Sequence, residues 1–95
     1  MPAYMIIDID VFDPAGFAEY RKALVPLIEK YDGKYIAVSD RVETLEGDWR
    51  PKRIVVVEFP SMDRATEWLD CEEYRQPCLI RKQTANTKMI LVQGV

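Results

Sequence analysis

The chain has 95 residues, of which 48% are hydrophobic and 31% charged, and its formal net charge at pH 7 is −3. The length and composition predict one globular domain over residues 1–95, and the scattered Lys and Arg exclude the cationic surface that nucleic acid or an anionic membrane requires. The sequence holds no histidine, which excludes Ser-His and Cys-His catalysis and histidine-ligated zinc or haem.

The first predicted element is a strand over residues 3–11, because apolar side chains alternate along it with a period of two. One face carries Met5, Ile7, Ile9 and Val11, and the other carries Tyr4, Ile6, Asp8 and Asp10. Asp13 and Pro14 then suit the N-cap and the first residue of a helix whose apolar residues recur at intervals of three and four. Pro26 predicts a kink in this helix, and Gly33 predicts a left-handed cap at its end.

The middle of the chain predicts a hairpin of two strands. Residues 34–39 form the first strand, which is expected to continue after a bend through residues 42–45. Residues 47–52, Gly-Asp-Trp-Arg-Pro-Lys, predict a turn. Residues 53–59 form the second strand of the hairpin, again with side chains that alternate between two faces.

The last third of the chain predicts a broken helix and a final strand. Ser61 suits the cap of a helix that is interrupted at Asp70 or Cys71 and resumes as a second stretch strained by Pro77. Residues 88–93 form the last strand. The order β-α-β-β-α-β is that of the split βαβ, ferredoxin-like α+β fold, with a four-stranded antiparallel sheet and both helices on one face.

The sheet face that the helices leave open is predicted to be both apolar and acidic. Its residues are Tyr4, Ile6, Asp8, Asp10, Tyr35, Ala37, Ser39, Ile54, Val56 and Glu58. A monomer rarely exposes such an apolar patch, and burying unpaired carboxylates is costly. A homodimer formed sheet against sheet satisfies both constraints, with apolar residues packed and polar residues lining a cavity or a wet rim. A ligand or a different protein on this face is the alternative.

The chain resembles the bacterial family known as domain of unknown function 1330, within the dimeric α+β barrel superfamily. The resemblance is carried by AYMIIDIDVFDP, EYRKALVPLIEKYDGKYI and LEGDWRPKRIVVVEFPS, and by EEYR and MILVQG near the end. The chain departs from the family pattern at Pro77 and at Cys71-Glu72. The resemblance implies a homodimer with a barrel-like sandwich of sheets, and it implies no particular activity. Relatives in the superfamily include cofactor-free monooxygenases, lactone isomerases and haem proteins.

Glu58 and Asp8 are the candidate catalytic residues. Pairing of the first strand with residues 53–59 is expected to bring the two carboxylates within about 5–6 Å on the open face, where their repulsion would keep one protonated. That is the arrangement of a general acid and base near neutral pH. The alternative is that Glu58 forms an ion pair with Arg or Lys, including one across the dimer interface.

Asp10, Tyr35, Trp49 and Arg50 are the candidate ligand-binding residues. Trp49 could stack on a ligand and Arg50 could bind its carboxylate, although Trp49 could equally anchor the turn against the partner subunit. Asp8 and Asp10 with Glu58 make an incomplete ligand set, so no metal and no cofactor are expected.

The two cysteines, Cys71 and Cys78, are expected to be free, because on one helix they would lie roughly 10 Å apart. They are read as two small semi-buried side chains, with a reactive thiol as the alternative. The N-terminal MPAYMIID lacks the features of a signal peptide, so the cytoplasm is the expected location.

Three functions remain open from the sequence. The first is carboxylate-assisted, metal-free proton transfer on a small, partly apolar metabolite. The second is non-catalytic binding of such a molecule, and the third is a structural dimer without a ligand. Whether the protein is an enzyme is therefore left undecided at this point.

Overall fold

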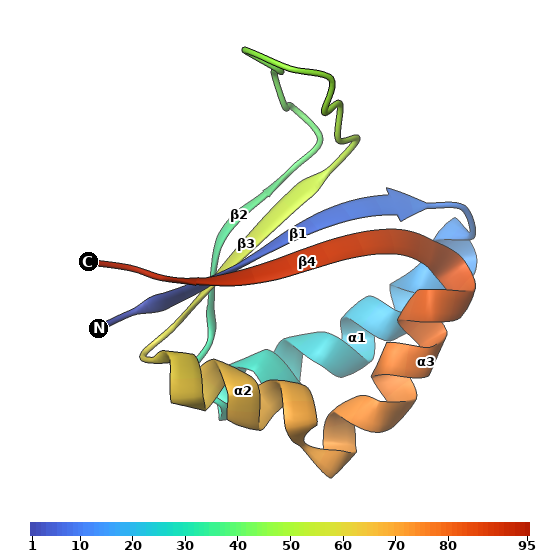
Figure 1. Cartoon of the computed structure of the whole chain (residues 1–95). Coiled ribbons are helices and arrows are strands. Elements are labelled where there is room, and N and C mark those ends of the chain that lie inside the picture. Colours follow the sequence, from blue (N-terminus) through green and yellow to red (C-terminus); the bar gives the residue numbers. More distant parts are fainter.

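The computed structural model describes residues 1–95 and contains one four-stranded sheet with its helices on one side (Figure 1). The elements are β1 (Ala3–Val11), α1 (Pro14–Lys30), β2 (Lys34–Ser39), β3 (Ile54–Phe59), α2 (Met62–Asp70), the 3₁₀ turn η1 (Glu72–Tyr74), α3 (Arg75–Thr84) and β4 (Ala85–Gln93). All neighbouring strands are antiparallel, in the order β2-β3-β1-β4. This order confirms the predicted ferredoxin-like topology. No helix is both long and apolar enough to span a bilayer.

The core lies between the sheet and the three helices. Met5, Val57 and Phe59 point from the sheet into this layer, where they meet Ile28 of α1 and Trp68 of α2, and all five side chains are almost completely buried. The alternating burial along β1 and β3 agrees with the period of two in the sequence. Each strand therefore presents its other set of side chains to the open face.

Both predicted N-caps are confirmed, whereas the end of α1 differs from the prediction. The Asp13 carboxylate accepts a hydrogen bond from the Gly16 amide at 3.2 Å, and the Ser61 hydroxyl accepts one from Arg64 at 3.0 Å. The left-handed residue after α1 is Asp32, with φ of 64°, and not Gly33. Gly33 serves close packing instead, because a Cβ there would lie 2.7 Å from Ile28 Cγ2.

The predicted break in the second helical region is confirmed, but the predicted strain at Pro77 is wrong. α2 ends at Asp70, Cys71 is extended, and α3 begins at Arg75 after η1. Pro77 is consequently the third residue of α3. The amides of a helix's first turn have no intrahelical acceptor, so the missing N–H of a proline costs little there.

The β2–β3 connection departs most from the prediction. No strand forms over residues 42–45; residues 40–53 instead make an arm that projects beyond the sheet (Figure 1). β2 also carries a bulge, because Tyr35 pairs with Val57 while Ala37 pairs with the adjacent Val56. Because Ile36 is an extra residue in β2, the side chains before it point to the opposite face from the one that simple alternation predicts. Tyr35 therefore faces the helices, and its predicted place on the open face is wrong.

Candidate functional site

The two candidate catalytic carboxylates lie far apart on the open face. In the β1–β3 register, Tyr4 is opposite Glu58 and Asp8 is opposite Ile54. Four residues of strand therefore separate the two acidic positions, which is about 13 Å. The prediction of a close carboxylate pair is wrong. Ile6 pairs with Val56 near the centre of the β1–β3 register, so Asp8 lies toward one end of the paired segment and Glu58 toward the other. Glu58 instead pairs in register with Lys34 of β2.

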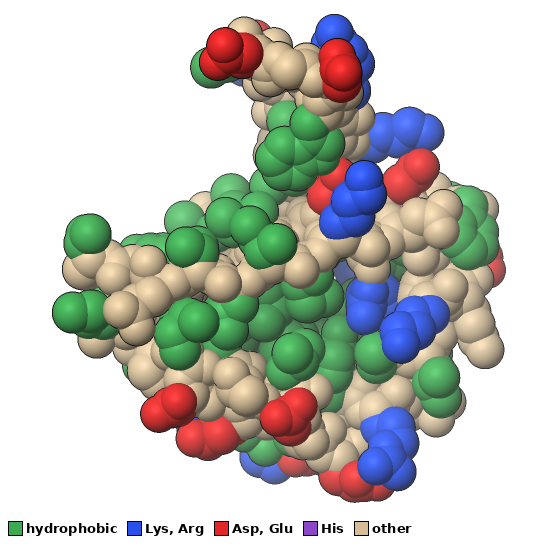
Figure 2. Space-filling view, in the orientation of Figure 1, with side chains coloured by type: hydrophobic (Ala, Val, Ile, Leu, Met, Phe, Trp, Pro, Cys, Tyr) green, Lys and Arg blue, Asp and Glu red, His purple; other side chains and the backbone are tan.

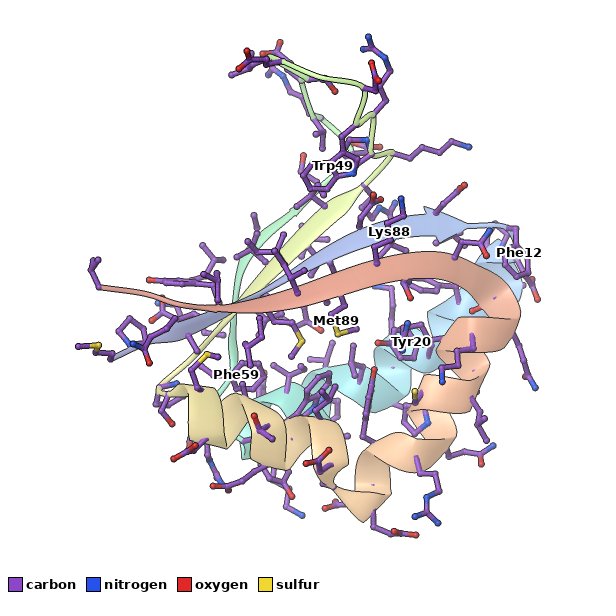
Figure 3. All side chains as sticks on the ribbon, viewed as in Figure 1. Phe12, Tyr20, Trp49, Phe59, Lys88 and Met89 are labelled. Atoms are coloured by element: carbon purple, nitrogen blue, oxygen red, sulfur yellow. The ribbon has the colours of Figure 1, made fainter.

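Asp8, Asp10, Trp49 and Arg50 do come together, where the arm meets the sheet. They line a polar cleft of about 750 Å³ with residues at the start of β4. The Trp49 indole donates a hydrogen bond to Asp8 Oδ2 at 2.7 Å, and Lys52 Nζ lies 3.4 Å from Asp10 Oδ1. Figure 3 shows Trp49 at the base of the arm, above the sheet face from which Lys88 projects. Trp49 thus fastens the arm to β1 of its own chain.

These carboxylates do not amount to a metal site. No group of three or more Asp, Glu, Cys or His side chains in the chain is placed to hold an ion. Asp10 already has a cationic neighbour in Lys52, and Asp8 accepts from Trp49. The cleft therefore offers a balanced set of charges, in which Lys52, Arg50 and Lys88 stand against three aspartates.

A second site, which the sequence pattern did not indicate, lies inside the fold between α1 and the sheet. It is an apolar cavity of about 160 Å³, lined mainly by core side chains that include Leu24, Val38 and Val55. Its polar members are Tyr20, Arg21, Tyr35, Arg53 and Trp68. Figure 3 shows Tyr20 beneath the sheet, on the helix side. Nothing in the sequence signals this cavity, because alternation of apolar residues predicts that the layer between helix and sheet is filled.

The two cavity tyrosines stay protonated. Burial, reinforced by the neighbouring Tyr74, raises the pKa of Tyr20 far above its ordinary range. Burial also raises the pKa of Tyr35, although Arg21 opposes part of that effect. The Nε1–H of Trp68 is buried without a hydrogen-bond partner. The cavity therefore carries hydrogen-bond donors in an otherwise apolar lining, and it lacks a carboxylate that could act as a base.

Comparison with known proteins places this chain in a family. Residues 2–95 match the model of the family described as domain of unknown function (DUF1330). The chain belongs to this family. No curated protein is significantly similar to this DUF1330 chain in sequence.

Solved structures share the fold of this DUF1330 chain at low sequence identity. A protein of unknown function from Rhodopseudomonas palustris superposes with a TM-score of 0.82 at 18% identity, over 99% of this chain and 82% of that one. A dimeric ferredoxin-like protein from Jannaschia sp. CCS1 gives 0.77 at 7% identity, over 99% and 100%. SnoaB, a cofactor-independent oxygenase from Streptomyces nogalater, gives 0.72 at 10% identity, over 99% and 93%. At these identities the similarity shows a common fold.

Proposed function

We propose that this DUF1330 protein binds a small, largely apolar molecule of single-ring size in the cavity between α1 and the sheet. The observation that supports this most strongly is an apolar cavity of about 160 Å³ that contains the unpartnered indole N–H of Trp68. An engineered apolar cavity of about 150 Å³ in another protein admits benzene. Because the buried indole N–H of Trp68 can only donate and has no partner, the ligand carries an oxygen that accepts a hydrogen bond from it.

Binding is favoured over carboxylate-assisted proton transfer, the enzymatic alternative. Such chemistry needs an acid or base within hydrogen-bond reach of the substrate. The cavity has no Asp or Glu in its lining, and the carboxylates of Asp8 and Glu58 belong to the opposite face of the sheet. Because a cofactor-independent oxygenase shares the fold, the binding assay should include a measurement of oxygen consumption for each ligand that binds.

Phenol is a suitable probe, because it combines one ring with one oxygen. We expect saturable shifts of the Leu24 and Val55 methyl signals in NMR spectra of the wild-type protein. Val38→Trp should abolish them by filling the mouth of the cavity, where Val38 is 48% exposed. Ile36→Trp is the matched control, since Ile36 is 49% exposed on the same strand but lies outside the lining. Equal phenol binding by both variants would rule out this cavity as the site.

We also propose that the protein works as a homodimer through the open sheet face. Ile6, Ile54 and Val56 occupy the middle of that face, and β4 adds Ile90 and Val92, which are 60% and 45% exposed. Large apolar residues grouped in this way mark an interaction surface. Among the structural neighbours, the ferredoxin-like proteins from Jannaschia and from Bacteroides fragilis are described as dimeric.

The cytoplasm is the location we propose for this dimer. Cys71 and Cys78 are both free thiols in the structure, which suits a reducing compartment. Fractionation of cells that express the protein at its natural level tests this location.

A further inference from the structure

One arginine is buried in the helical layer without an acidic partner. Arg81 of α3 is only 8% exposed, and it takes part in none of the ion pairs of the structure. Removing a guanidinium from water is costly unless an opposite charge and hydrogen bonds replace the lost hydration. A charge left in this condition points to an anion that completes the site.

The hydrogen bonds of Arg81 show which part of the guanidinium is free. Its Nη1 donates to the hydroxyl of Thr87. Its Nη2 reaches only the thiol sulfur of Cys78, at 3.5 Å, and sulfur is a weak acceptor. Its Nε is buried with no partner. Nε and Nη2 share one edge of the planar group, the edge that pairs with both oxygens of a carboxylate.

A further donor lies close to Arg81. The hydroxyl of Tyr74 is also buried without a partner, and Tyr74 is 3% exposed. Burial raises the pKa of Tyr74, with Arg81 opposing part of the increase, so its hydroxyl keeps its proton. Tyr74 and Arg81 therefore present several N–H and O–H groups and no negative charge, which is the complement of an oxyanion.

A groove of about 770 Å³ leads to this cluster between α3 and β4. Tyr74, Cys78 and Arg81 line it, together with the apolar side chains of Leu69, Leu79 and Met89. Arg75 and Lys82 add two further cations to its walls, against one acid, Asp70. Figure 2 shows Lys and Arg side chains gathered where α3 meets β4, beside a hollow lined with hydrophobic side chains, and Figure 3 shows Met89 directed from β4 toward that hollow.

We propose that this groove binds a small organic acid, with its carboxylate on the Nε–Nη2 edge of Arg81 and its apolar part along Leu79 and Met89. The carboxylate takes the place of the Cys78 thiol, which rotates aside, and it accepts a further hydrogen bond from Tyr74. The groove shares no lining residue with the cavity between α1 and the sheet. Ligand binding in the groove can therefore be tested independently of ligand binding in the cavity.

Thermal unfolding in sodium hexanoate tests this site, with sodium chloride and 1-hexanol as controls for ionic strength and for the apolar tail. Hexanoate should raise the melting temperature by on the order of 10 °C at about 100 times its dissociation constant. Arg81→Met should remove the effect, and without ligand it should be at least as stable as the wild type because a buried unpaired charge is gone. Lys22→Gln is the matched control, since it removes one exposed charge that lies outside the groove and should keep the response.

Several results would overturn the site. One is a hexanoate response that survives in Arg81→Met or is absent from the wild type. Another is a marked loss of stability in ligand-free Arg81→Met, which would make Arg81 a structural partner of Thr87. If Arg81→Met fails to fold, Arg81→Lys replaces it in the test. Lysine keeps the positive charge but lacks the planar pair of donors that binds both carboxylate oxygens. Arg81→Lys should weaken hexanoate binding at least tenfold, and unchanged affinity would refute the bidentate contact.

Discussion

The rings of Trp68 and Tyr74 are in contact, with their centroids 4.3 Å apart and their planes tilted by 37°. Trp68 belongs to the lining of the cavity and Tyr74 to the lining of the groove. The pair is thus part of the wall between two spaces that open on different sides of the helical layer. Any ligand that shifts one ring changes the surroundings of the other.

Trp68 should therefore report on both spaces by its fluorescence. The Trp49→Phe variant leaves Trp68 as the sole tryptophan, since the chain has two. We expect its emission to change on addition of either phenol or hexanoate. In the reciprocal variant Trp68→Phe, the exposed Trp49 should not respond. A response carried by Trp49 would mean that the ligands bind at the arm.

Disruption of the open face should dissociate the proposed dimer. Light scattering at micromolar concentration is expected to give twice the 11.1 kDa of one chain. Ile54→Asp should reduce this to the monomer mass, because the interface would then bury a charge without a partner. Leu79→Asp on α3 is the control, as Leu79 is exposed on the helical side. A wild-type protein that scatters as a monomer would refute the interface.

Stability should fall as the pH rises above 10. The folded pKa of Tyr20 lies above the ordinary value of 10.0 that applies in the unfolded chain, mainly because of burial. The unfolded chain therefore releases a proton in this range while the folded chain keeps it, so the stabilising contribution is complete below pH 10 and is lost above it. Tyr35 and Tyr74 act in the same direction.

Urea denaturation between pH 8 and 11 measures this dependence. Tyr20→Phe should flatten the decline, because the buried group no longer titrates in either state. The variant should also retain most of its stability at pH 8, since the ring is preserved. A decline as steep as that of the wild type would assign the effect to the other buried tyrosines.

Removal of the Asp8 carboxylate should release the arm. Asp8 accepts the Trp49 hydrogen bond at 2.7 Å, and a hydrogen bond to a charged group contributes about 1.5–3 kcal/mol when it is shielded and less when it is exposed. With about 1 kcal/mol lost in Asp8→Ala, tryptic cleavage after Arg41 and Lys52 should accelerate roughly fivefold. Asp10→Ala removes only the exposed contact to Lys52 and should change the rate little.

The sequence predicted those parts of the fold that local chemistry determines. Asp13 and Ser61 cap helices because their side chains reach nearby amides, and the period of two along β1 follows from its pleat. The bulge at Ile36 leaves no such signal, because one extra residue in an apolar strand looks like an unbroken strand. This bulge is the reason that Tyr35 lies on the helix side of the sheet and not on the open face.

The candidate site was predictable only in part. Asp8, Asp10 and the turn containing Trp49 and Arg50 were identified by residue type, and the arm brings them together. The distance between Asp8 and Glu58 could be predicted only from the register of β1 against β3. In that register the two residues lie toward opposite ends of the paired segment. The lack of an acidic partner for Arg81 could not be predicted from the sequence, because it depends on which Asp and Glu side chains the folded chain brings near Arg81.

The bulge in β2 also bears on how these molecules can aggregate. Both β2 and β4 are edge strands, and an edge invites another strand to pair with it. β4 is paired with β1 in a regular register of nine residues and leaves an uninterrupted free edge, whereas the bulge at Ile36 sets the amides and carbonyls of β2 out of line. An endless fibre would need every molecule to use both edges. Because a bulge protects an edge strand from pairing, strand pairing between molecules should favour β4 against β4, a two-fold contact that closes on itself and stops at two chains.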